Sequence, residues 1–295
     1  QQELSQELPP EMASKFAIQE VGETAQQPAV EEPPVKDKKK KTKAELAKEK
    51  KQAAPFEFPN RRPTDREPIP VGERLVYDVT YLGVPAGELT VTVHQHKQIN
   101  GRKVYHIEGR AVSSSVFSMF YKLDDTVESF VDYEGFFSHR FHLKLNESKQ
   151  TRDALELYDS EKKQTFYWNR WNHYKKGFSE TKEFHDIERF PQDSLSALYY
   201  LRVLNFPPGE ERSFPVVSEG KNWEAVVHFV RTEKMETPFG EIDTVVVKPE
   251  TKFQGVLQKK GDSFAWLTND GRHILVRLEA KVKIGSVVAV LKEAR

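Results

Sequence analysis

Residues 75–93 read LVYDVTYLGVPAGELTVTV, and this stretch decides the fold. Apolar side chains recur at every second position on both sides of a central GVPAG segment at 83–87. A period of two places alternate side chains on one face of a β-strand, whereas two glycines and a proline suit a tight turn. The stretch therefore predicts a β-hairpin that begins a series of antiparallel strands.

Strand signals continue through most of the chain after residue 72. Asn100-Gly101 is a typical hairpin turn, and a three-residue loop at 100–102 aligns Val91 with Ala111 so that apolar side chains share one face. Further strands are predicted at 124–132, 137–145, 155–158, 164–171, 173–178, 223–232, 243–249, 255–259, 264–268, 273–283 and 286–292.

One amphipathic helix interrupts the strands at 193–204. Asp193 suits the N-cap because its carboxylate accepts the free N–H groups of a first turn, and prolines at 207 and 208 prevent continuation. Its apolar stripe consists of Leu195, Leu198, Tyr199 and Leu201. We expect a mainly β fold, a large curved antiparallel sheet or incomplete β-barrel, with this principal helix covering the concave side and an apolar cavity or a packed interior beneath it.

Residues 1–70 differ from the remainder in composition. Residues 1–35 are rich in Gln, Glu, Pro and Ala, residues 36–51 contain nine lysines, and residues 55–70 contain five prolines. Low hydrophobicity and segregated charge bury too little apolar surface to offset the entropy of ordering. We therefore expect a disordered arm at 1–70 and a β-rich domain at 71–295. The lysine run either contacts anionic surfaces or is a solvated spacer.

Bulk composition narrows the functional classes. The 45 basic and 45 acidic residues cancel, so no global field steers the chain to nucleic acid or to anionic lipid. No apolar run approaches the roughly 20 residues that a transmembrane segment needs. The absence of cysteine excludes disulfides and thiolate chemistry. Because the chain begins at Gln1, we expect that a secretory signal peptide has been removed and that the protein is periplasmic or otherwise exported in a bacterium.

Four segments resemble an exported bacterial family catalogued as domain of unknown function 3108. They are 77–87 (YDVTYLGVPAG), 121–128 (YKLDDTVE), 193–202 (DSLSALYYLR) and 266–272 (WLTNDGR), the last followed by Gly285. The resemblance implies an exported β-rich domain over about 72–291. It implies no activity and no catalytic residue. By analogy of fold, related curved-sheet domains of bacterial envelopes hold lipid or polymer in a half-barrel.

Three histidines are the best candidates for metal ligands in this sequence. In the predicted register, His96 faces His106 and His94 faces Glu108, and such pairs could supply zinc ligands. Imidazoles on a solvated strand face are the commoner arrangement, so we expect no metal and no cofactor.

Carboxylates form a second cluster near Asp125. A glycosidase needs two carboxylates about 5 to 9.5 Å apart, but an exposed acidic strand is the commoner reason for such a cluster. The cluster consists of Asp124, Asp125, Glu128 and Asp132.

Aromatic residues give the candidate binding surface. Aromatic planes beside amide and basic groups suit a sugar or polymer, and arginines that line a cavity can hold an anion. The alternative is that alternate aromatic side chains form core. The candidate ligand-binding residues are Trp168, Trp171, Tyr174, Arg202, Trp266 and Arg272.

These features favour a non-catalytic envelope protein that binds a lipid, a glycan or an envelope protein through its curved sheet. Two alternatives stay open: a cell-wall glycan hydrolase that uses carboxylates near Asp125, and a purely structural scaffold. An apolar cavity beneath the helix favours the carrier, whereas convergent carboxylates in an open cleft favour the hydrolase. A filled interior favours the scaffold.

Limited proteolysis tests the predicted boundary. Trypsin should cut first within the lysine run at 36–51 and should leave a stable core that starts near residues 68–72. Mass spectrometry of the fragments gives the order of cutting. Protection of the lysine run in the free protein would contradict the prediction.

Overall fold

The computed structural model describes residues 8–21, 56–253, 256–257, 262–281 and 285–295. These residues form one antiparallel sheet in the order β10-β11-β12-β14-β15-β16-β2-β3-β4-β5-β6-β7-β8-β9, with β1 beside β3 and β13 beside β12. The strands are β1 (Gln19–Glu20), β2 (Arg74–Tyr81), β3 (Val84–Ile99), β4 (Arg102–Ser113), β5 (Asp124–Asp132), β6 (Ser138–Glu147), β7 (Gln150–Asp159), β8 (Gln164–His173), β9 (Gly177–Asp186), β10 (Glu211–Ser218), β11 (Lys221–Thr237), β12 (Gly240–Phe253), β13 (Val256–Leu257), β14 (Ser263–Thr268), β15 (Leu275–Lys281) and β16 (Ser286–Ala294).

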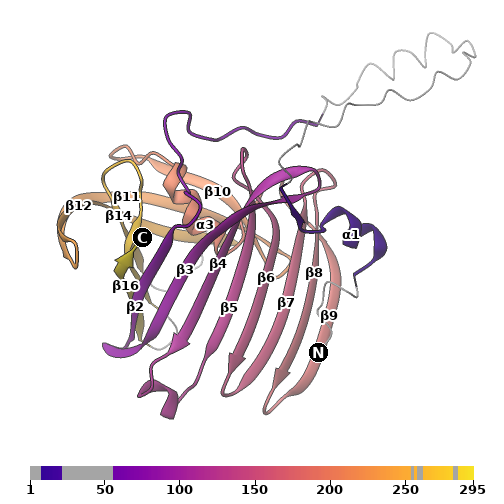
Figure 1. Cartoon of the computed structure of the whole chain (residues 1–295), viewed down its shortest axis with the longest axis horizontal. Coiled ribbons are helices and arrows are strands. Elements are labelled where there is room, and N and C mark those ends of the chain that lie inside the picture. The colour runs from indigo at the N-terminus through magenta and orange to yellow at the C-terminus, as the bar shows by residue number, and fades with distance from the viewer. Residues whose placement is uncertain (1–7, 22–55, 254–255, 258–261, 282–284) are drawn as a thin grey trace, which may run out of the picture.

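The sheet curves around its principal helix, as the sequence predicts (Figure 1). Strand β16 pairs with β2, so the two strand-rich halves of the chain form one continuous sheet. Strands β9 and β10 lie at its two ends, and in the described part of the chain no ladder joins them. The predicted curved, incompletely closed sheet is therefore confirmed. Among the described residues, no helix is both long and apolar enough to cross a membrane.

The helix is shorter than the predicted 193–204. It consists of α3 (Ser196–Tyr200), followed by the 3-10 turn η3 (Leu201–Val203). The Asp193 carboxylate accepts the N–H groups of Leu195 and Ser196 at 2.8 and 2.7 Å, so it stabilises the turn that leads into α3. At the other end, Leu204 adopts an extended backbone with ψ of 149° and ends the helix before the prolines.

The predicted register between β3 and β4 is wrong. Asn100 and Gly101 both have positive φ, 51° and 71°, and form a two-residue turn whose twist matches the flanking strands. An irregularity between His94 and Lys97 then shifts the ladder, so that Val91 pairs with Gly109. A bulge inserts an unpaired residue into one strand, and a pattern of apolar positions does not reveal it.

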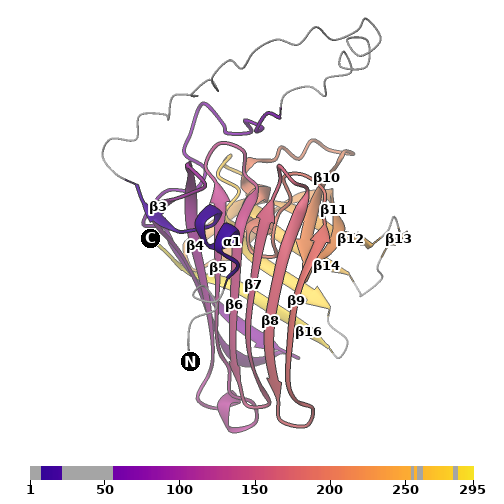
Figure 2. The same ribbon diagram turned by 90° about the vertical axis from the view of Figure 1, so that its right-hand side faces the viewer.

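Two parts of the expected arm contact the sheet (Figures 1 and 2). Helix α1 (Pro10–Lys15) lies on the outer face, where Met12 and Phe16 are buried against side chains of β3, β4, β5, β7 and β8. Upstream of β2, Phe58 stacks on Phe137, and Ile69 is buried in the main core. Residues 22–55, which include the lysine run, lie outside the described residues, so the arm and its boundary at 71 stay a prediction.

The hairpin of β2 and β3 depends on two glycines. Gly83 has a φ of 78°, which side chains disfavour. Gly87 has an ordinary φ, but a Cβ there would lie 2.1 Å from the carbonyl oxygen of Val112 on β4. Both glycines are therefore required, one for its backbone conformation and one for the close approach of a neighbouring strand.

Replacement of Gly87 tests this close approach. Gly87→Val should lower the free energy of unfolding by about 1–3 kcal/mol or more, because β4 must move away to admit the side chain. Urea denaturation measures the change. Gly101→Asn is the control, since nothing lies within 4 Å of its Cβ position and asparagine tolerates a positive φ. Equal destabilisation by the two variants would show that the β3–β4 contact is adaptable.

Candidate ligand-binding cavity

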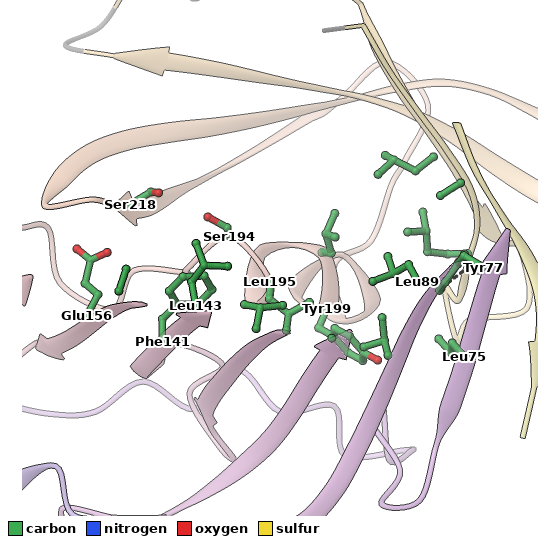
Figure 3. A pocket seen from close by; sticks show the side chains of 18 of the residues that line it. Leu75, Tyr77, Leu89, Phe141, Leu143, Glu156, Ser194, Leu195, Tyr199 and Ser218 are labelled. Carbon is green, nitrogen blue, oxygen red and sulfur yellow. Dashed lines mark hydrogen bonds between the residues drawn. The ribbon is translucent and has the colours of Figure 1, made fainter. Parts of the chain in front are cut away.

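A cavity of about 360 Å³ lies between α3 and the inner face of the sheet (Figure 3). Most of the side chains that line it are apolar and come from strands on both sides of the β16–β2 ladder. In Figure 3, Glu156, Ser194 and Ser218 lie at one end, and Leu75, Tyr77 and Leu89 lie at the other. The apolar lining comprises Leu75, Tyr77, Leu89, Val91, Val127, Phe141, Leu143, Ala154, Tyr167, Leu195, Leu198, Tyr199, Leu275, Leu278 and Ala289.

Asp193 fixes α3 over this face of the sheet. Its carboxylate is fully buried and accepts hydrogen bonds from the hydroxyls of Ser129 on β5 and Ser138 on β6, at 2.5 and 2.6 Å. Burial raises the pKa of this carboxyl, and the hydroxyl and backbone donors oppose the rise. Because both strands hold the helix start, Leu195 and Tyr199 face the cavity.

The far end of the helical segment is held by an ion pair. Arg202 donates from both terminal nitrogens to Glu73, at 2.5 and 2.9 Å, and both side chains are buried. Its Nε donates to the carbonyl oxygen of Arg272 at 3.2 Å. Arg202 lines the cavity, yet its guanidinium is occupied by these partners. An anionic ligand would have to displace Glu73 to bind it.

The polar end of the cavity is built around Glu156 on β7. Its carboxylate accepts the backbone N–H groups of Glu219 and Gly220 at 3.0 and 2.9 Å, and the Thr165 hydroxyl at 3.3 Å. The first two donors belong to the turn between β10 and β11, so Glu156 attaches that turn to the sheet. Burial raises the pKa of Glu156 to about 7, although these hydrogen bonds oppose the rise.

Arg152 also lies on β7 and contacts the side chain of Glu219 in the turn between β10 and β11. It donates to the Glu219 carboxylate at 2.6 Å, and also to the Tyr167 hydroxyl and the Asn169 side chain at 2.6 Å each. Glu156 and Arg152 therefore have hydrogen-bond partners within the protein. What the cavity offers to a ligand is mainly apolar surface.

A second, wider hollow of about 940 Å³ adjoins the cavity. The two share Ser194, Leu198, Ser218, Glu219 and Leu278 as lining residues. Leu198 is half-buried and stands where the two spaces meet. A ligand longer than the inner cavity could therefore extend past Leu198 into the outer hollow.

The predicted aromatic surface does not assemble in one place. Trp168 is buried on the outer face with Phe16, whereas Trp171 lies three residues along β8 and donates to Gln150. Tyr174 is exposed in the turn that follows. On β14, Trp266 donates to Glu233 and does not line the cavity. Arg272 is exposed and pairs with Asp270.

The histidines pair with carboxylates on the outer face. His94 contacts Glu108 at 3.2 Å, and His106 contacts Glu128 at 2.9 Å. His96 lies apart, between the rings of Tyr105 and Tyr133. The described residues contain no group of three or more ligands arranged to hold a metal ion. His142, which contacts Asp153 at 2.6 Å, extends the same row and was not among the predicted residues.

The acidic cluster is dispersed among separate partners. Asp124 pairs with Arg110, Glu128 with His106, and Asp132 with Arg102. For Asp125, burial and the hydrogen-bonded carboxyl of Glu147 raise the pKa to about 6. Two carboxyls in direct contact are closer than the roughly 5 to 9.5 Å that flanks a glycosidic bond, and neither lines the cavity.

Sequence reasoning missed Glu156 and Arg152. A signal exists in the segment DALELYD at 153–159, where Glu156 is the single charge in an otherwise apolar run of five. A lone carboxylate among strand core residues indicates burial, because charged groups are rarely buried without partners. The partners at 219 and 220 could not be read from the sequence.

Comparison with known proteins identifies a matching family and several similar solved structures. The family described as "Protein of unknown function (DUF3108)" matches residues 76–292. No curated protein matches.

A beta-barrel-like protein of domain of unknown function DUF1849 from Brucella abortus has a TM-score of 0.49 and 13% identity, covering 77% of this chain and 98% of that chain. A candidate lipoprotein from Parabacteroides distasonis has a TM-score of 0.34 and 12% identity, covering 81% and 100%. A candidate exported protein with a YmcC-like fold from Bacteroides fragilis has a TM-score of 0.33 and 12% identity, covering 77% and 97%.

The raised pKa of Glu156 predicts a pH dependence of stability. The folded protein holds the proton up to about pH 7, whereas the unfolded chain releases it near the ordinary pKa of 4.5. The stabilising effect is therefore complete below pH 4.5 and is lost as the pH rises through 7, a loss of about 3 kcal/mol. Urea denaturation of wild type and Glu156→Gln at pH 5 and pH 8.5 measures it. Parallel pH profiles for the two proteins would show that Glu156 titrates normally.

Proposed function

The chain belongs to the DUF3108 family, and we propose that it is a non-catalytic, exported envelope protein that binds a lipid-like apolar ligand beneath α3. The observation that carries this proposal is the cavity of about 360 Å³ with an apolar lining. Its size falls within the range of small-molecule sites, which are concave and mostly apolar. A molecule with an apolar chain fits such a lining.

The chemistry of the lining favours lipid over glycan. A glycan presents many hydroxyl groups, and each one buried without a partner costs free energy. The charged groups at the two ends, Glu156 with Arg152 and Glu73 with Arg202, already bind protein partners. A ligand therefore gains little from new hydrogen bonds and much from removing apolar surface from water.

The same features disfavour the hydrolase. Catalysis of glycan hydrolysis needs two separated carboxylates that face the substrate. Asp125 and Glu147 contact each other outside the cavity, and Glu156 is fixed by the turn at 219–220. Export is supported by the cysteine-free sequence and by the family resemblance. In this proposal the charged arm at 1–70 links the binding domain to the envelope.

Leu198→Ala tests the proposal. Because Leu198 stands between two spaces, its truncation should cost less than the roughly 2–5 kcal/mol of a packed core leucine. It should weaken binding of a neutral apolar fluorescent probe about tenfold, since the probe loses an apolar contact. Fluorescence titration and urea denaturation measure the two effects.

The matched control is Leu157→Ala on the outer face, where Leu157 is fully buried. This variant should show the full core cost and unchanged probe affinity. If wild-type protein takes up no probe and Leu198→Ala is severely destabilised, the interior is packed and the scaffold function replaces the carrier. Native mass spectrometry of protein purified from its own host identifies a retained ligand.

A further inference from the structure

Four connections meet at one end of the sheet and form a surface that we call the loop rim. It consists of residues 82–83 between β2 and β3 with Val84 at the start of β3, 114–123 between β4 and β5, 148–149 between β6 and β7, and 174–176 between β8 and β9. In Figure 1 these turns lie along the lower edge of the sheet, and the segment that leads into β2 lies along the opposite edge. The rim is thus one continuous end of the molecule.

Backbone hydrogen bonds hold the four connections together. The Ser114 N–H donates to the Ala86 carbonyl at 2.8 Å, which ties the second connection to the start of β3. The Ser148 N–H donates to the Lys122 carbonyl at 2.8 Å, and the Tyr174 N–H donates to the Lys149 carbonyl at 3.0 Å. The rim therefore presents its side chains from a fixed frame.

Large apolar side chains project from this frame into solvent. Phe120 and Met119 are 79% and 74% exposed, in the segment that includes the 3-10 turn η2 (Phe117–Met119). Single exposed apolar residues are ordinary, but several of them on the turns at one end of a sheet indicate a contact surface. The exposed group on the rim comprises Leu82, Val84, Val116, Met119, Phe120 and Tyr174.

Lysines accompany these apolar side chains. Lys122, Lys149, Lys175 and Lys176 are all exposed. Of the nearby carboxylates, Asp124 pairs with Arg110, and Glu147 accepts hydrogen bonds from Tyr121 and Gln150 and contacts the carboxyl of Asp125. The ammonium groups of Lys175 and Lys176 lie 5.4 and 5.2 Å from the ring centres of Tyr174 and Trp171. The rim thus combines protruding apolar groups, interfacial aromatics and excess positive charge.

We propose that the loop rim docks onto an anionic lipid surface. Apolar side chains on turns can enter the boundary between headgroups and acyl chains, while aromatic residues and lysines lie at headgroup level. Each lysine near an anionic bilayer contributes about fivefold in affinity. A protein partner would more naturally bind a concave or flat apolar face, whereas these side chains protrude from loop tips. The loop rim shares no residue with the cavity. Docking to a lipid surface can therefore be tested independently of the carrier function.

Vesicle co-sedimentation of the full chain tests the proposal. Binding should be strong to vesicles that contain phosphatidylglycerol, weak to vesicles of phosphatidylcholine alone, and reduced by high salt. Lys175→Gln with Lys176→Gln should weaken binding to the anionic vesicles by up to about 30-fold, and Phe120→Ser by about 10-fold or more. The lysine run at 36–51 is identical in every variant, so differences among variants report on the rim.

Matched controls lie elsewhere on the sheet. Lys162→Gln with Lys163→Gln removes two adjacent exposed lysines before the same strand, β8, at its opposite end. Phe239→Ser removes a phenylalanine that is 52% exposed in the turn between β11 and β12. Both controls should bind anionic vesicles like wild type. These side chains are exposed, and the ion pair that Lys162 forms with Glu11 lies at the surface, so thermal unfolding should change little in any variant.

Tryptophan fluorescence measures whether the loop rim inserts into the bilayer. After subtraction of the wild-type emission, which comes from four tryptophans, the added emission of Phe120→Trp should shift to shorter wavelength on addition of anionic vesicles, and that of Phe239→Trp should not. Equal vesicle binding by rim and control variants, or no binding of wild type to either vesicle, would overturn the proposal. Rim variants that change only self-association in sedimentation velocity would assign this surface to protein contacts and would also overturn it.

Discussion

The buried carboxylate of Asp193 is the interaction on which the rest of the structure depends. A carboxylate removed from water is strongly destabilising unless donors surround it. Here the hydroxyls of Ser129 and Ser138 and the N–H groups of Leu195 and Ser196 supply four hydrogen bonds. These donors come from β5, β6 and the start of α3, so one side chain fixes the position of the helix on the curved sheet.

The cavity follows from that placement. Among the described residues α3 and η3 cover only part of a broad inner face, and a single short helical segment cannot fill the space that a strongly curved sheet encloses. The ion pair of Glu73 and Arg202 holds the end of this segment, just as Asp193 holds its start. Fixed at both ends, the helix cannot sink into the sheet, and the apolar surface beneath it stays available to a ligand.

The outer face, the inner face and the two ends of the strands differ in what covers them. Part of the outer face is covered by α1, and histidines on this face pair with carboxylates. The inner face holds the cavity. One edge is overlain by the segment that leads into β2, whereas the loop rim leaves apolar and basic side chains in solvent. An apolar cavity and a surface suited to anionic lipid occur in one molecule, at sites that do not share residues.

The sequence by itself determined the antiparallel sheet, the hairpin at 75–93, the two glycines it needs and the presence of one helix with Asp193 at its start. These properties depend on periodicity and turn chemistry within a few neighbouring residues, so they can be read locally. Tertiary structure alone decided the register after the His94–Lys97 irregularity, the separation of the predicted binding residues from one another, and the role of Glu156. Glu156 binds a turn 64 residues away, and Glu73 binds an arginine 129 residues away. The curvature of the whole sheet determines which distant residues come into contact, and no local sequence pattern predicts that curvature.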